Sequence, residues 1–190
     1  QGAAQDLVDS IMFVRQSTVR LDLLRHLNSL IDDGTIQTPA VIVPALSIED
    51  INDSLGLTAA TAPRHHVAYD SYQVGAPISA LPGSEGFIGN LVRELIRQPG
   101  AAKGTWIGPH SSLDEVKAAR CNTLVIVTDY AGSGQQLVEF AKTFTRNATI
   151  RSWRSGGFLK LHAVAYTATT AAIGRLNSRT SPIDSCSVVR

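Results

Sequence analysis

The sequence predicts an α/β fold in which a mostly parallel central sheet is covered by helices. The first observation is the apolar, β-favouring run 124–127, which leads into Asp129 and the Gly-Ser-Gly segment 132–134. Such a run is typical of a parallel strand that is buried on both faces. The second observation is the alternation of strand-like and helix-like segments after residue 104, which is the pattern of βαβ units. A length of 190 residues fits a single domain of ordinary size.

The first 35 residues are expected to form a helical region. Apolar side chains recur at helical spacing between residues 5 and 32, in two stripes separated by the polar segment 15–18. A helical hairpin or one interrupted helix fits this pattern. The Asp32-Asp33-Gly34 sequence is a turn signal at its end.

Residues 36–74 are expected to be a more variable segment. Prolines on either side of residues 40–43 limit that apolar stretch to a brief strand or an edge position. Residues 58–67 are small, polar and proline-containing, which indicates a loop. His65 and His66 would face opposite ways on a strand, so we expect a surface or partly buried pair rather than a metal site.

The core of the domain is expected between residues 75 and 177, followed by a tail, residues 178–190, without a recognisable pattern. The sequence predicts helices at 87–97, 112–120, 135–144 and 171–177, and strands at 104–107, 124–127 and 158–167. The first of these helices has one apolar stripe with charged residues on the opposite side, so it should pack on the sheet. Trp153 lies between two arginines; it could stack a base or cover the sheet, and the core position is the commoner one.

The composition excludes several classes of protein. With 17 basic and 16 acidic residues the formal net charge is +1, so no overall field favours nucleic acid or an anionic membrane, and any anion site must be local. The two cysteines, Cys121 and Cys186, lack the spacing of a metal site or a disulfide framework. No apolar run is long enough to span a bilayer and no signal peptide is recognisable, so we expect a cytoplasmic protein without a membrane partner.

The end of the central apolar strand is the candidate functional site. Open α/β sheets bind ligands where the carboxyl ends of strands meet helix N-termini. Gly132 and Gly134 have no Cβ, so the backbone there can adopt a positive φ and approach a ligand closely. The amides of residues 133–135 would then converge at the positive end of a helix dipole, which suits a phosphate. The alternative is an ordinary βα turn in which Ser133 caps the helix and Asp129 is solvated.

This stretch resembles the signature of the phosphoribosyltransferases, which is an apolar strand, two acidic residues and a short Thr/Ser-Gly loop. The resemblance implies the Rossmann-like, three-layer type I fold, in which the acidic pair holds the ribose hydroxyls of phosphoribosyl pyrophosphate and the loop holds its 5′-phosphate. Asp129 matches the second acidic residue, and the resemblance implies that it is the catalytic and Mg²⁺-binding residue. Thr128 stands where the first acidic residue should be, and Gln136 stands where a hydroxyl residue usually closes the loop. The implied ligand-binding residues are Thr128, Asp129, Tyr130, Ala131, Gly132, Ser133, Gly134 and Gln135.

The segment before the 87–97 helix resembles a second element of that family. In the family, a loop between an early strand and such a helix cradles the pyrophosphate through its backbone. Residues 79–86 match this loop by position, with Ser84 and Glu85 as implied ligand-binding residues, although the segment lacks a basic residue. A Pro-Gly-Ser sequence is equally typical of any loop before a helix, with Ser84 as the N-cap.

Residues 75–175 are similar, more narrowly, to the divergent phosphoribosyltransferase-like domains found beside bacterial conflict and antiphage genes, including some retron operons. This resemblance implies a sensor or effector that binds a phosphorylated ribose or nucleotide, with other proteins of a defence operon or retron complex as partners. The alternative is an active phosphoribosyltransferase that uses phosphoribosyl pyrophosphate and Mg²⁺ to join or split a base and a ribose phosphate. A lone carboxylate offers one charge fewer to place magnesium pyrophosphate, which favours the binding role. The sequence leaves the base, the activity and the oligomeric state open.

Overall fold

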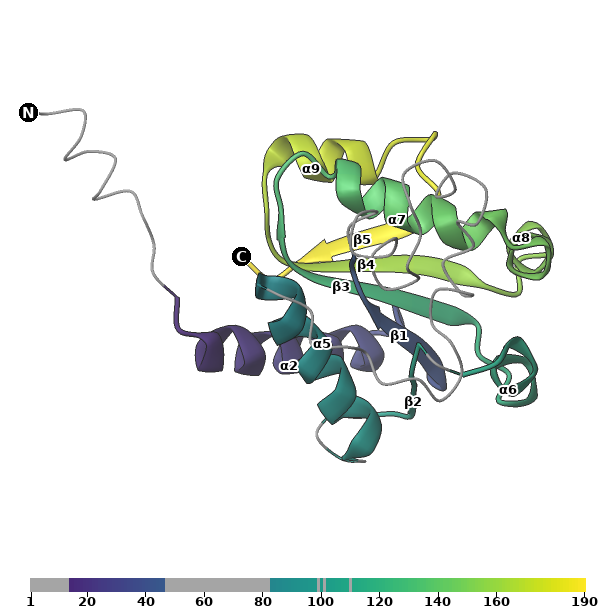
Figure 1. Cartoon of the computed structure of the whole chain (residues 1–190), viewed down its shortest axis with the longest axis horizontal. Helices are drawn as coiled ribbons and strands as arrows, with labels where there is room; N and C mark the ends of the chain where they lie inside the picture. Colours follow the sequence, from purple (N-terminus) through teal and green to yellow (C-terminus); the bar gives the residue numbers. More distant parts are fainter. Residues whose placement is uncertain (1–13, 47–82, 99, 101, 110) are drawn as a thin grey trace, which may run out of the picture.

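The structure, a computed structural model, describes residues 14–46, 83–98, 100, 102–109 and 111–190. In these parts of the chain five strands form one sheet, in the order β2-β1-β3-β4-β5, and every neighbouring pair is parallel (Figure 1). The strands are β1 (Ala40–Pro44), β2 (Trp106–Ile107), β3 (Thr123–Ala131), β4 (Lys160–Ala168) and β5 (Ser185–Val188). The α/β class with a parallel sheet is therefore confirmed, and the architecture is consistent with a Rossmann-like fold.

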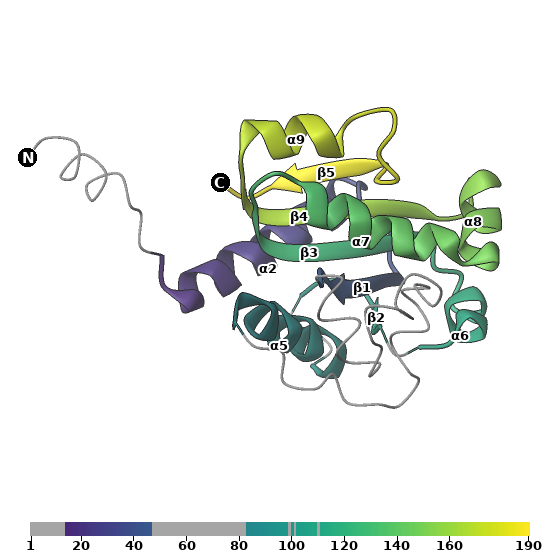
Figure 2. The same ribbon diagram turned by 45° about the horizontal axis from the view of Figure 1, so that its top comes forward.

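Helices cover both faces of this sheet, so the described part of the chain has three layers, which Figure 2 shows from a second direction. One face is covered by α2 (Gln16–Asp32) and α5 (Gly83–Arg97), whose buried side chains pack against Val125 and Val127 of β3. The other face is covered by α6 (Leu113–Ala118), α7 (Gln135–Arg146), α8 (Ala148–Ser155) and α9 (Thr170–Leu176). Within the described ranges, no helix combines the length and the apolar character needed to cross a membrane.

The order of the strands places a switch point between β1 and β3. These two strands are neighbours, but the chain continues from β1 through α5 to β2 on one side, and from β3 through α7 and α8 to β4 on the other. The helices α5 and α7 lie on opposite faces of the sheet. This is a doubly wound sheet with the 2-1-3-4-5 order, and such sheets bind ligands outside the carboxyl ends of the strands at the switch point. The topology therefore places a candidate site where β3 ends.

β1 is the brief strand that its prolines predict, and the alternative of an edge position is wrong, because β1 pairs with β2 on one side and with β3 on the other. β3 differs from the sequence prediction at its end. β3 does not end with the apolar run at residue 127, because Thr128, Tyr130 and Ala131 continue the pairing with β4. Asp129 is consequently a residue of the strand and not of the loop that follows it.

The helices agree better with the sequence. α2 confirms the helical pattern over residues 16–32 and begins within the polar segment 15–18, while residues 1–13 lie outside the described part. α5, α6, α7 and α9 lie where amphipathic or capping signals predict helices, and α6 has a complete capping box between Ser112 and Glu115. The expected loop at 58–67 and its histidine pair also lie outside the described residues.

Two elements, α8 and β5, are not predicted by the sequence analysis. α8 follows α7 with only Asn147 between them, and the Asn147 side chain caps α8 by accepting from the amides of Thr149 and Ile150. β5 lies within the expected tail at 178–190 and pairs with β4, so that expectation is corrected. Its Ser-Cys-Ser-Val sequence has no apolar run because it is an edge strand and each of its residues is half-buried.

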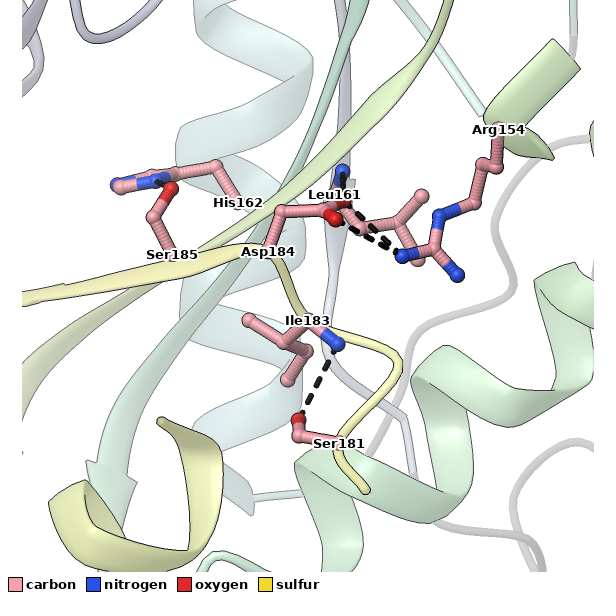
Figure 3. Close-up of polar contacts among 7 residues, drawn as sticks. All are labelled: Arg154, Leu161, His162, Ser181, Ile183, Asp184 and Ser185. Atoms are coloured by element: carbon pink, nitrogen blue, oxygen red, sulfur yellow. Dashed lines mark hydrogen bonds and ion pairs between the residues drawn. The ribbon is translucent and has the colours of Figure 1, made fainter. Parts of the chain in front are cut away.

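A carboxylate connects these two unexpected elements to the sheet (Figure 3). Asp184, which immediately precedes β5, accepts a hydrogen bond from the Leu161 amide at 2.7 Å. Both of its carboxylate oxygens also accept from one Nη of Arg154 in α8, at 3.1 and 3.0 Å. The arginine side chain is only 20% exposed. Asp184 thus joins α8, β4 and the start of β5.

Candidate functional site

The end of β3 brings the predicted site residues to the carboxyl edge of the sheet. Val125 and Val127 of β3 pack on the α2 and α5 face, and Asp129, two residues further along the strand, is half-buried. Ala131 packs in the cluster on the α7 face, so strict alternation of the side chains does not continue to the end of β3. The Thr128 hydroxyl donates to the Tyr130 carbonyl at 3.3 Å. A ligand that used both Asp129 and the following turn would lie at the end of β3.

The turn after β3 is fastened to the beginning of α9. The Ala131 carbonyl accepts from the Thr169 amide at 3.0 Å, and the Gly132 carbonyl accepts from the Thr169 hydroxyl. The same hydroxyl accepts from the Ala172 amide at 3.1 Å and so caps α9. Thr169 therefore holds the turn in place and caps α9 at the same time.

Gly134 is required where the turn becomes α7. Its φ is +70°, in the left-handed region, and it is the N-cap residue of α7. A Cβ on Gly134 would lie 3.1 Å from the Ala172 carbonyl oxygen and 3.2 Å from the Ala172 Cα. Because these are backbone atoms of α9, there is no side chain that could move aside. The close approach of two backbones thus explains the second glycine of the Gly-Ser-Gly segment.

The backbone amides of the turn differ in whether they have a hydrogen-bond acceptor. The Ser133 hydroxyl accepts from the Gln135 amide at 3.2 Å, but the N-cap residue of α7 is Gly134, which has no side chain to cap the helix, so the Ser133 cap of the alternative interpretation is not found. For the amides of Ser133 and Gly134, no acceptor is found among the residues that the structure describes. They lie at the start of α7, where unpaired amides and the helix dipole favour a negative charge. The arrangement can bind an anion through the backbone.

A cation that sequence reasoning missed lies next to this turn. Arg175 of α9 donates through Nη1 to the side-chain carbonyl of Gln135, and the Gln135 amide group donates to Glu139. Two other basic residues are paired away from the turn: Lys103 with Asp32 and Arg154 with Asp184. No local pattern marks Arg175, because its position beside the turn depends on the packing of α9 against α7.

The second predicted loop is only partly described. Residues 79–82 lie outside the described part of the chain, and the backbone is already helical from Gly83, so α5 includes Ser84 and Glu85 in its first turn. Their side chains are outside the description. α5 links parallel strands, so its N-terminus points toward the carboxyl edge of the sheet, but the role of Ser84 and Glu85 stays a prediction.

Two polar features lie on the opposite face of the sheet from α7, beneath and beside α2. His162 of β4 is buried, and its two ring nitrogens contact the hydroxyls of Ser185, at 2.5 Å, and Ser187, at 3.1 Å. Burial lowers the pKa of His162 to about 4, and the charge of His26 acts in the same direction. A groove of about 410 Å³ runs beside α2 and is lined by Asp22, Arg25, His26, Ser29, Val189 and Arg190. Most of its charge is already paired, because Asp22 binds both arginines and the Tyr166 hydroxyl.

The donor set at the end of β3 offers little for a resident metal ion. Asp129 is the single carboxylate of β3, and no group of three or more His, Cys, Asp or Glu side chains in the described ranges could hold a metal. One carboxylate holds Mg²⁺ together with phosphates of a substrate rather than alone. Comparison of the chain with known proteins found no matching family model, curated protein or solved structure.

Proposed function

We propose that the chain binds a phosphorylated ribose or a nucleotide at the carboxyl edge of its sheet, at the switch point between β1 and β3. The backbone amides of residues 133–134 would donate to the phosphate. Asp129 would accept hydrogen bonds from ribose hydroxyls across the end of β3. The proposal needs no overall positive charge, because the phosphate site is built from a helix start and backbone amides.

The observation that carries the proposal is the conformation of the turn. Gly134 has a positive φ, contacts the α9 backbone and leaves two neighbouring amides without a described acceptor, all where a doubly wound sheet binds its ligand. Arg175 supports the same conclusion, because it adds a positive charge beside Gln135.

Binding is favoured over transferase chemistry by the residues that precede the turn. Thr128 brings no charge, and its hydroxyl is engaged with the Tyr130 carbonyl. Departure of pyrophosphate calls for a metal and cations near the leaving group. Asp129 could share Mg²⁺ with a substrate, but it has no second carboxylate on β3 to help it. The resemblance to domains of antiphage operons adds the proposal that the bound ligand is a signal within a defence complex.

Calorimetry and thermal shift with ribose 5-phosphate and adenosine 5′-monophosphate test the proposal. Ligand binding should raise the melting temperature in proportion to the logarithm of ligand excess. Asp129→Asn should weaken binding about 5- to 20-fold, because it replaces a charged acceptor of ribose hydroxyls by a neutral one. Asp114→Asn, at an exposed position of α6, is the matched control and should bind like the wild type.

Two results would contradict the proposal in different ways. If neither ligand binds the wild-type chain at millimolar concentration, the proposed site is wrong. If both ligands bind and Asp129→Asn is unaffected, the phosphate part stands and the ribose contact is wrong. Release of pyrophosphate from phosphoribosyl pyrophosphate, Mg²⁺ and a panel of bases, above the level of the Asp129→Asn variant, would instead support the transferase.

A further inference from the structure

An exposed aromatic ring lies beside the proposed phosphate turn. Tyr130 is the penultimate residue of β3, at the carboxyl edge, and 58% of it is exposed. Its ring lies against Gly132: a Cβ at that glycine would be 3.1 Å from Cε1 and 3.6 Å from Cζ of the tyrosine. The first glycine of the Gly-Ser-Gly segment therefore leaves space for the ring. The result is an aromatic surface held against the turn and open to solvent.

The position of this ring selects among phosphorylated ligands. Tyr130 has no positive charge with which to hold a phosphate, and the adjacent backbone amides already supply that contact. An exposed aromatic side chain can, however, stack on a nucleobase, and such stacking tolerates any base because every base has a π-face. A ribose phosphate without a base gains no such contact. A phosphate-binding turn beside an aromatic ring fits a ligand that has both a phosphate and a base.

We propose that Tyr130 stacks on the base of a nucleotide whose phosphate lies at the 132–134 turn. The inference rests on the proposed function and narrows it from a phosphorylated ribose to a nucleotide. The base lies on the ring of Tyr130, while the phosphate receives the amides of Ser133 and Gly134. Tyr130 thus positions the ligand and favours nucleotides over ribose phosphates that have no base.

A second exposed aromatic residue provides a matched control. Phe158 is 71% exposed, and its ring also lies against a glycine, with Cε2 2.6 Å from a Cβ built on Gly156. It precedes β4 and so lies at the amino edge of the sheet, away from the end of β3. Replacement of Phe158 by alanine removes a similar exposed ring without touching the proposed site.

The test measures the affinities of adenosine 5′-monophosphate and ribose 5-phosphate for four proteins by calorimetry. The wild type should bind the nucleotide about 5- to 150-fold more tightly than ribose 5-phosphate, which is the usual worth of one stacked base. Tyr130→Ala should remove most of this preference and leave the affinity for ribose 5-phosphate unchanged. Tyr130→Phe keeps the ring and should retain the preference, as should Phe158→Ala.

The outcomes distinguish failure of the stacking role of Tyr130 from failure of the proposed phosphate site. Equal affinities of the wild type for the two ligands, or an equal loss of both in Tyr130→Ala, would overturn the stacking role and leave the phosphate site intact. Failure of both ligands to bind the wild type would overturn the proposed function, and the stacking role with it. Circular dichroism of each variant shows whether it is folded, and Tyr130→Phe gives the decisive comparison should the alanine variant unfold.

Discussion

Replacement of Gly134 by alanine should destabilise the fold more than the same replacement at Gly157. The two glycines have nearly the same backbone conformation, with φ of +70° and +72°. An alanine in this left-handed region costs about 1–2 kcal/mol at either position. At Gly157 no atom lies within 4 Å of the added methyl group, so this backbone cost is the whole effect.

The contact with α9 adds a second cost at Gly134 alone. The new methyl group would lie 3.1 Å from the Ala172 carbonyl oxygen and 3.2 Å from its Cα, so the start of α9 has to move. Overpacking of this kind costs about 1–3 kcal/mol. The free energy of unfolding should therefore fall by about 2–5 kcal/mol for Gly134→Ala and by about 1–2 kcal/mol for Gly157→Ala.

Urea denaturation followed by circular dichroism measures both values, provided that the two variants unfold with the wild-type m-value. The difference between the variants isolates the contact, because the conformational cost is common to both. Equal losses of stability would refute the reasoning. They would mean that the backbone at Gly134 does not lie as close to α9 as the structure places it.

Two further predictions concern polar groups away from the turn. Asp184→Ala should lower the free energy of unfolding by about 1–3 kcal/mol in urea denaturation, because it leaves the Leu161 amide and Arg154 without their acceptor. Asp32→Ala, which breaks the exposed ion pair with Lys103, is the control and should lower the free energy of unfolding by less than about 1 kcal/mol. Equal losses in the two variants would contradict this prediction. Because the pKa of His162 is lowered to about 4, the unfolded chain binds the proton first as the pH falls. The free energy of unfolding should therefore fall by up to about 3 kcal/mol between pH 6.5 and 4. In His162→Gln the free energy of unfolding should depend less steeply on pH over this range. The same pH dependence in both proteins would mean that other groups cause the effect.

The sequence predicts those parts of the fold whose signals are local. The apolar run of β3 and the apolar stripes of α5 and α7 follow from period and composition, so their positions are confirmed. The end of β3 is not predicted, because residues Thr128 to Ala131 belong to the strand through pairing with β4, a contact that no local pattern reveals. β5 is undetectable for the same reason, since an edge strand needs no apolar run.

One missed element did have a local signal. Asn147 is a favourable N-cap and Gly156 follows the last residue of α8, so a short helix between them was within reach of sequence reasoning. The roles of Arg175 and Thr169 cannot be predicted from the sequence. Arg175 reaches the turn only because α9 packs beside α7, and Thr169 serves as a cap that any hydroxyl residue could supply. The glycines thus mark the proposed site in the sequence, while the contacts that support the turn depend on tertiary packing.

The support from α9 changes how binding at the turn should be understood. Two carbonyls of the turn are held by Thr169, and Gly134 is held against the backbone of Ala172. An anion that arrives at the amides of Ser133 and Gly134 therefore meets a turn that has already lost its conformational freedom during folding. Since ordering a loop opposes association, a turn fixed in this way binds more tightly for the same number of hydrogen bonds. If the proposed site binds an anion, its affinity should therefore depend on the packing of α9 against the turn as well as on the amides themselves.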